Sequence, residues 1–199
     1  MASNQTSHTK AASTKPLLST YNLVLTAMFA AVLAVISQIS IPMPTGVPVT
    51  IQAFGIALTG AVLGWKLGTI STIVYILLGA VGLPIFANFM GGIQVLAGMT
   101  GGYIWGWPFM AALCGLRFHT GNSKTDLILS IIMSLIGLLI MEFTGGLQWY
   151  LLSGEMTMKA IIIYSFTAFI PKDMVITVAA VIVGRRINHL LGRHLRQLL

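Results

Sequence analysis

Two acidic residues stand inside long apolar segments, where an ionisable side chain is costly and usually serves a function. They are Glu142 and Asp173, and the basic residue Lys172 directly precedes the second acid. Carboxylates accept hydrogen bonds and an ammonium group donates them, so these side chains could bind a small polar ligand. Each also has a structural alternative. Asp173 could begin a helix after Pro171, Glu142 could bond a neighbouring helix, and Lys172 could lie at a membrane interface.

Several amide side chains are predicted to lie at about the same depth in the membrane as the two acids. An amide both donates and accepts, which suits the orientation of a small polar ligand in an apolar pocket. These residues are Gln38, Gln52, Asn88, Gln94 and Gln148. The aromatic residues Trp149 and Tyr150 follow directly, and they indicate either a ring stacked on a ligand or part of an aromatic belt at the membrane interface.

The sequence lacks the motifs of several enzyme classes. It contains no phosphate-binding loop of the ATPase type, no His-Glu-x-x-His and no Gly-x-Ser-x-Gly. Cys114 is the single cysteine, which excludes an intrachain disulfide and a cysteine-based metal site. We therefore expect a binding protein with no cofactor and no catalytic residues, and not an enzyme.

The composition of the chain predicts that these residues are carried by membrane helices. Of the 199 residues, 56% are hydrophobic and 8% are charged, whereas a soluble domain has about 25% charged residues. The sequence predicts an all-α integral membrane protein with six transmembrane helices in one bundle over residues 20–192. A disordered tail at 1–19 and a basic tail at 193–199 flank it, both cytoplasmic. The six apolar segments are 21–39, 49–65, 67–83, 95–116, 127–152 and 173–187. Residues 158–170 are apolar but too short to cross alone. Pro171 ends or kinks them, and the sixth span either begins at 173 or includes residues before Pro171.

The positive charges orient this topology. Six spans place both termini on one side, together with nine of the eleven Lys and Arg residues: Lys10, Lys15, Lys66, Arg117, Lys124, Arg185, Arg186, Arg193 and Arg196. The other side receives Lys159 and Lys172. This asymmetry predicts cytoplasmic termini and makes a nucleic-acid partner unnecessary as an explanation of the basic charge. The Pro- and Gly-rich segments 41–49, 83–94 and 153–172 then become structured extracellular loops around a pocket with a lid.

The first apolar segment carries a strip of small residues at helical spacing. They are Ala27, Ala30, Ala31 and Ala34. Such strips allow a second helix to approach closely. The strip predicts either docking of a partner protein or packing within this chain.

Several short motifs follow one another along the apolar part of the chain. They are IPMP at 41–44, PVTIQAFG at 48–55, GAVGLPIFA at 79–87, GMTGGYIWG at 98–106 and PKD at 171–173. In this combination and order they resemble the BioY family, over about residues 20–190. Members of this family are the biotin-specific substrate-binding (S) components of energy-coupling factor (ECF) transporters.

The resemblance implies a protein of the prokaryotic plasma membrane that captures biotin on the extracellular side with high affinity. It also implies a complex with a transmembrane coupling protein (T component) and two ATPase subunits, which consume the ATP. In this family the alanine strip docks onto the coupling protein, and the acid at position 173 binds the ureido ring of biotin.

The chemistry of biotin fits the remaining candidates. Its ureido ring has two N–H donors and one carbonyl acceptor, which Asp173 and Asn88 can complement, and Glu142 lies close to the same pocket. Apolar walls for the ring and the valeryl chain are expected from Phe86, Phe89 and Trp149, and a donor for the biotin carboxylate from Gln52, Tyr150 or Lys172. The alternative function is a self-sufficient secondary transporter of biotin or another small polar solute, coupled to protons through Glu142.

Overall fold

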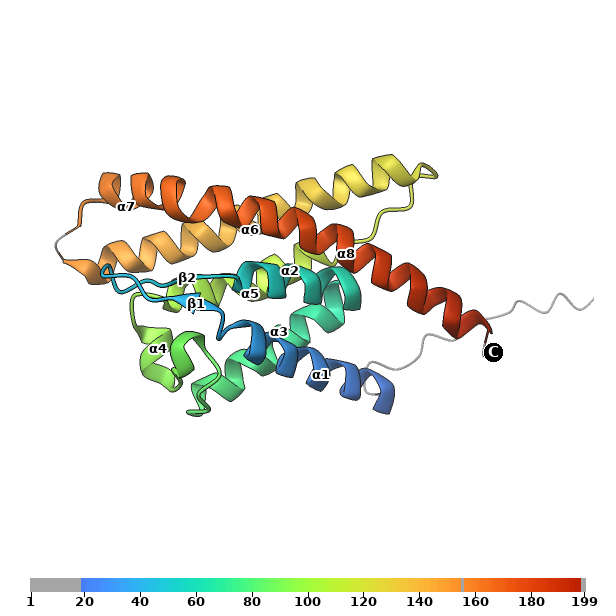
Figure 1. Ribbon diagram of the computed structural model, residues 1–199, viewed down its shortest axis with the longest axis horizontal. Helices are drawn as coiled ribbons and strands as arrows, with labels where there is room; N and C mark the ends of the chain where they lie inside the picture. The colour runs from blue at the N-terminus through green and yellow to red at the C-terminus, as the bar shows by residue number, and fades with distance from the viewer. Residues whose placement is uncertain (1–18, 155, 198–199) are drawn as a thin grey trace, which may run out of the picture.

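The structure is a computed structural model that describes residues 19–154 and 156–197, without the side chains of His189 and of residues 191–197. The described chain is mostly helical (Figure 1). Its α-helices are α1 (Thr20–Ile36), α2 (Gln52–Leu63), α3 (Trp65–Ala80), α4 (Ile93–Ala97), α5 (Gly101–Cys114), α6 (Ser123–Ser153), α7 (Met158–Tyr164) and α8 (Ile170–Gln197). The shorter elements are β1 (Ser40–Ile41), β2 (Val49–Thr50), the 3-10 turn η1 (Ala87–Phe89) and the π-helical turn η2 (Ser165–Phe169).

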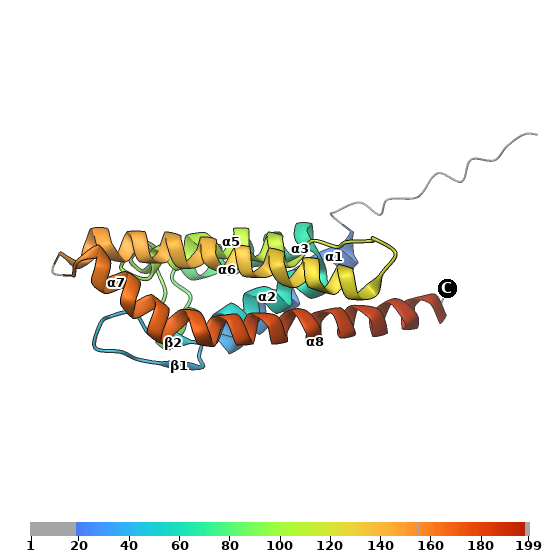
Figure 2. The same cartoon turned by 90° about the horizontal axis from the view of Figure 1, so that it is seen from above.

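The irregular segments gather at one end of the molecule. The β1–β2 segment, α4 and α7 lie there, whereas the start of α1 and the end of α8 lie toward the opposite end (Figures 1 and 2). The two short strands are antiparallel, with Ser40 opposite Thr50 and Ile41 opposite Val49. The chain between them contains three prolines, which cannot continue a helix. This end is therefore the place where the loops can surround a ligand.

Glycines allow the long helices to pack closely. A Cβ atom at Gly106 of α5 would lie 2.7 Å from the Cα of Met141 in α6. A Cβ at Gly184 of α8 would lie 2.6 Å from the Cβ of Ala61 in α2. Both distances are far below ordinary contact, so only glycine permits these two helix pairs to approach as they do.

The surface of the described helices is apolar, as expected of a membrane protein. The helices Ser123–Ser153 and Met158–Asn188 are long and apolar enough to cross a membrane, and α1, α2 and α3 are shorter apolar helices. Large apolar side chains point outward along the two long helices, among them Phe143, Phe166 and Val175. Such contiguous exposure would be a liability in water, but it suits contact with lipid.

Three boundaries differ from the sequence predictions. The second apolar segment becomes helical at Gln52 and not at 49, because Val49 and Thr50 pair with β1. The fourth helix begins at Gly101, because α4 is a separate short helix that ends at Ala97. Residues 193–197, predicted as part of a tail, continue α8 as helix.

Residues 158–170 belong to the last long helix, one of the two possibilities that the sequence left open. The sequence left open whether the helix ends or kinks at Pro171, and the structure continues it from Met158 to Asn188. The π-helical turn at Ser165–Phe169 ends two residues before the proline. A proline lacks the N–H that would bond the carbonyl four residues earlier, and its ring collides with that carbonyl. The π-helical turn is wider than an α-helical turn and makes room for the proline ring. The helix therefore continues through Pro171, and the continuous helix is long enough to cross a membrane.

Candidate functional site

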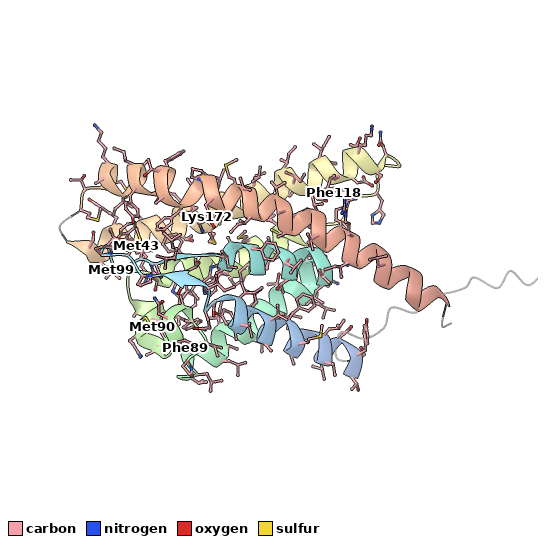
Figure 3. The ribbon with its side chains drawn as sticks, viewed as in Figure 1. Met43, Phe89, Met90, Met99, Phe118 and Lys172 are labelled. Atoms are coloured by element: carbon pink, nitrogen blue, oxygen red, sulfur yellow. The ribbon has the colours of Figure 1, made fainter. Side chains whose placement is uncertain are left out.

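A cavity of about 260 Å³ lies at the end of the molecule where the loops gather. Its wall comes from residues 46–53, from 86–104, from Trp107, and from the facing helices α6 and α8. Lys172 extends from α8 toward the β1–β2 segment (Figure 3). The cavity therefore joins segments that are far apart in the sequence, and it lies where the extracellular loops were expected to converge.

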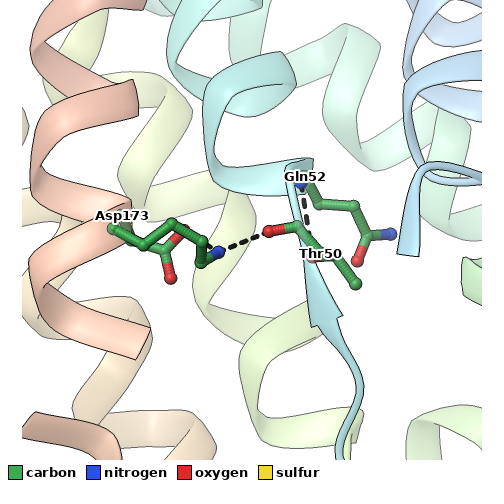
Figure 4. A network of polar contacts seen from close by, with 4 residues as sticks. Thr50, Gln52 and Asp173 are labelled. Atoms are coloured by element: carbon green, nitrogen blue, oxygen red, sulfur yellow. Dashed lines mark hydrogen bonds and ion pairs between the residues drawn. The ribbon is translucent and has the colours of Figure 1, made fainter. Parts of the chain in front are cut away.

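An ion pair joins two of the predicted residues in this wall. The Lys172 Nζ lies 2.6 Å from Asp173 Oδ1 and also donates to the backbone carbonyl of Thr50 (Figure 4). Asp173 is only 5% exposed. Within the described residues this ion pair is the one hydrogen bond of the Asp173 carboxylate, so the carboxylate keeps acceptor capacity for a ligand donor.

Glu142 is the second buried acid of the cavity. Its side chain is 7% exposed, and its Oε2 has no hydrogen-bond partner among the described residues. Burial of a polar atom without a partner costs about 1–3 kcal/mol. A ligand that brings a donor to this oxygen would recover that cost.

Two amides of the cavity have partners that orient them. Gln52 Nε2 donates to the Tyr75 hydroxyl at 3.4 Å, and that hydroxyl donates to the Ile85 carbonyl at 2.8 Å. Ser40 Oγ donates to Asn88 Oδ1 at 2.7 Å. Because Ser40 occupies the amide oxygen, Asn88 offers its Nδ2 donors to a ligand.

Aromatic rings form the apolar floor of the cavity. Phe86 is 2% exposed and packs edge-on against Tyr75 with centroids 5.6 Å apart. Trp107 lies 5.8 Å from the same Tyr75 ring. Since Phe86 and Trp107 both line the cavity, they provide the apolar surface that a ring-containing ligand requires.

The structure brings six of the nine predicted ligand residues to this cavity: Gln52, Phe86, Asn88, Glu142, Lys172 and Asp173. The other three lie elsewhere. Trp149 is fully buried behind the wall, against Tyr164 and Phe169. Tyr150 follows it by one position, which turns its side chain to the exposed surface of α6. Phe89 is 71% exposed, because left-handed backbone at Asn88 and Phe89 directs the ring away.

Several wall residues were not among the predicted ligands. Tyr103 and Trp107 lie four positions apart on α5 and both line the cavity. That spacing puts them on one helical face, and it was the available signal for finding them. Of the other amides noted in the sequence, Gln94 lines the cavity, whereas Gln148 donates to the carbonyls of Leu96 and Gly98 at 2.9 and 2.7 Å and fixes the joint between α4 and α5.

The predicted alanine strip of α1 is divided between two faces. Ala27 and Ala31 are exposed, next to the exposed side chains of Val24, Met28 and Val35. Ala30 is 3% exposed and belongs to the core, and Ala34 packs partly against it. The free part of the strip is therefore the apolar face around Ala27 and Ala31.

Together these features define a helical, membrane-type protein with a small-molecule pocket at one end. The family model described as "BioY family" matches residues 7–193, and the chain belongs to the BioY family. Among its relatives is the "Probable biotin transporter BioY" of Pyrococcus horikoshii, 38% identical over 82% of this chain and 94% of the relative. The "Biotin transporter BioY" of Thermotoga maritima is 37% identical over 84% of this chain and 96% of the relative.

A solved structure shares the fold. The crystal structure described as the S-component for biotin from an ECF-type ABC transporter superposes with a TM-score of 0.74. It is 28% identical in sequence, and the match covers 85% of this chain and 91% of the other. The resemblance inferred from the motifs is therefore confirmed, and the family is one of transport proteins and not of enzymes.

Proposed function

We propose that this chain is the biotin-binding S component of an ECF importer and that the cavity between the loops and α8 binds the vitamin. The observation that carries the proposal is the pair of buried carboxylates, Glu142 and Asp173, beside a cavity floored by aromatic rings. Relatives that cover most of this chain are named biotin transporters.

The polar groups of the cavity complement the ureido ring of biotin. The ring presents two N–H donors, for which Asp173 and the unpartnered Oε2 of Glu142 are acceptors. It presents one carbonyl, for which Asn88 Nδ2 is the donor, since Ser40 holds the other end of that amide. A ligand lacking these groups would leave buried atoms unpaired, at about 1–3 kcal/mol each. This cost would select biotin over apolar compounds of similar size.

The opposite end of biotin is a carboxylate on an apolar chain. Of the three donors expected for it, Tyr150 lies off the cavity, which leaves Gln52 and Lys172 in the wall. The Lys172 ammonium group is already paired with Asp173 and bonded to Thr50. We assign the carboxylate to Gln52, and to Lys172 the task of neutralising and orienting Asp173.

The proposed topology has six spans with both termini in the cytoplasm. The six spans are α1, α2, α3, α5, α6 and the continuous helix from α7 through α8. The start of α1 and the end of α8 lie toward the same end (Figure 2), which supports two cytoplasmic termini. The positive-inside rule then puts the cavity on the extracellular side.

The proposed partners are a T component and two ATPase subunits. The apolar face around Ala27 and Ala31 is exposed along α1, and small side chains let a partner helix approach closely. We assign this face to the T component. This chain would then capture biotin while the ATPase subunits supply the energy.

Uptake of labelled biotin into proteoliposomes tests the proposal. We expect the chain alone to bind biotin without accumulating it, and accumulation to require the T component, the ATPase subunits and ATP. Accumulation by the chain alone, abolished by a protonophore, would instead establish the proton-coupled alternative, for which the buried Glu142 would be the proton carrier.

A further inference from the structure

The chain that follows α1 is bonded to the loop that carries Asn88. Ser37, which is fully buried, donates from Oγ to the carbonyl of Ile85 at 2.5 Å. Gln38 Nε2 donates to the carbonyl of Phe86 at 3.2 Å, and Gln38 Oε1 accepts from the backbone N–H of Phe89 at 3.0 Å. One amide side chain therefore bonds the backbone on both sides of Asn88.

This loop adopts a backbone conformation that its residues disfavour. Asn88 and Phe89 have φ angles of 58° and 57°, in the left-handed region that L-residues rarely occupy. Asparagine tolerates the left-handed region better than most residues, because its side chain can form a local hydrogen bond, but phenylalanine has no such group. Such a conformation persists only where surrounding contacts hold it. Gln38 supplies one hydrogen bond on each side of Asn88.

The conformation determines where the Asn88 amide points. Asn88 lines the cavity, and its Oδ1 is held by Ser40. Ser40 and Gln38 both belong to the short segment between α1 and the pocket. Gln38 itself is not part of the cavity wall. Its contacts with the loop are with backbone atoms, so any effect on a ligand must pass through the loop.

We propose that Gln38 is a positioning residue for ligand binding: it clamps the 86–89 turn and thereby holds the Asn88 amide against the ureido carbonyl of biotin. The assignment rests on the proposed function. It extends the set of residues that determine specificity to a side chain that never touches the ligand.

A double-mutant cycle on the purified full-length chain tests the clamp. Calorimetric titration with biotin compares the unsubstituted chain, Gln38→Leu, Asn88→Ala and the double variant. We expect Gln38→Leu to weaken binding by about tenfold or more when Asn88 is present, and by less than about twofold in the Asn88→Ala background. Equal losses in both backgrounds, or no loss in either, would overturn the proposal.

Two further measurements separate positioning from folding and from ligand identity. Gln38→Glu keeps the acceptor for the Phe89 N–H but sets a carboxylate oxygen against the carbonyls of Ile85 and Phe86, so we expect a loss at least as large as in Gln38→Leu. Hydrogen exchange of the Phe89 amide should accelerate in Gln38→Leu while amides in α5 and α6 keep their rates. Unchanged exchange at the Phe89 amide would refute the clamp, whether or not the chain binds biotin. Absence of biotin binding by the unsubstituted chain would refute the proposed function but not the clamp.

Discussion

Val47 offers a direct test of whether the segment between β1 and β2 acts as a lid over the cavity. This segment, residues 42–48, contributes Gly46, Val47 and Pro48 to the cavity wall. Val47 is 4% exposed and packs in a cluster with Trp149, Ile161 and Phe169. The substitution Val47→Ala shortens this apolar anchor without adding a polar group, so it should loosen the lid and leave the ligand contacts in place.

The size of the effect follows from the buried carbon atoms. Val47→Ala removes two of them, and each buried methylene equivalent is worth about 0.8 kcal/mol. If Val47 is buried only while the lid is closed, the substitution lowers the free energy of opening by about 1.6 kcal/mol. Biotin should then be released about 15 times faster. The assay is a chase of labelled biotin from the purified chain with excess unlabelled biotin.

The matched control is Val35→Ala. Val35 lies on α1 and is 71% exposed, so the same chemical change there should leave the release rate unaltered. Equal release rates for Val47→Ala and the unsubstituted chain would show that residues 42–48 do not restrain the ligand. Equal acceleration in both variants would show that the effect comes from general destabilisation.

Three further predictions concern the site and the docking face. Asp173→Asn should weaken biotin binding by more than about tenfold, measured by calorimetry, because a carboxylate acceptor is worth about 1.5–3 kcal/mol. Energised uptake by the unsubstituted complex should be insensitive to a protonophore, because the importer draws on ATP, and vesicle uptake with the inhibitor checks this. Ala31→Trp should leave biotin affinity within about twofold and abolish co-purification with the T component. The neighbouring change Ala30→Trp should instead lower the melting temperature, because Ala30 is buried in the core.

Each of these predictions has an outcome that contradicts it. An unchanged affinity in Asp173→Asn would remove the carboxylate from the site, and Asp126→Asn, at the far end of α6, serves as the control. Loss of uptake on adding a protonophore to the unsubstituted energised complex would support proton coupling, for which the buried Glu142 is the candidate carrier. Equal loss of biotin binding and of co-purification in Ala31→Trp would indicate packing within the chain.

Charged residues were the part of the site that could be predicted from the sequence. Glu142, Lys172 and Asp173 are visible because a charge inside an apolar segment is rare, and all three line the cavity. The loop segments were visible for a similar reason, since proline and glycine interrupt the apolar pattern. Asn88 was visible as one of the polar amides, and the resemblance supplied only the ligand whose ureido carbonyl it could meet.

The direction of the aromatic side chains could not be predicted in the same way. Trp149 and Phe89 are close in sequence to cavity segments, but one is buried behind the wall and the other points outward. Their directions depend on helix rotation and on a left-handed turn that no local pattern reveals. The role of Gln38 depends on bonds to residues about fifty positions away, and such pairings arise only in the folded chain.

Titration of the purified chain with biotin and with two analogues, one lacking the ureido carbonyl and one lacking the carboxylate, tests directly whether this cavity is the biotin site. We expect saturable binding of biotin, weaker binding of both analogues, and no further loss for the first analogue in Asn88→Ala. Equal binding of biotin and the analogue without the ureido carbonyl would contradict the assignment of this cavity as the biotin site.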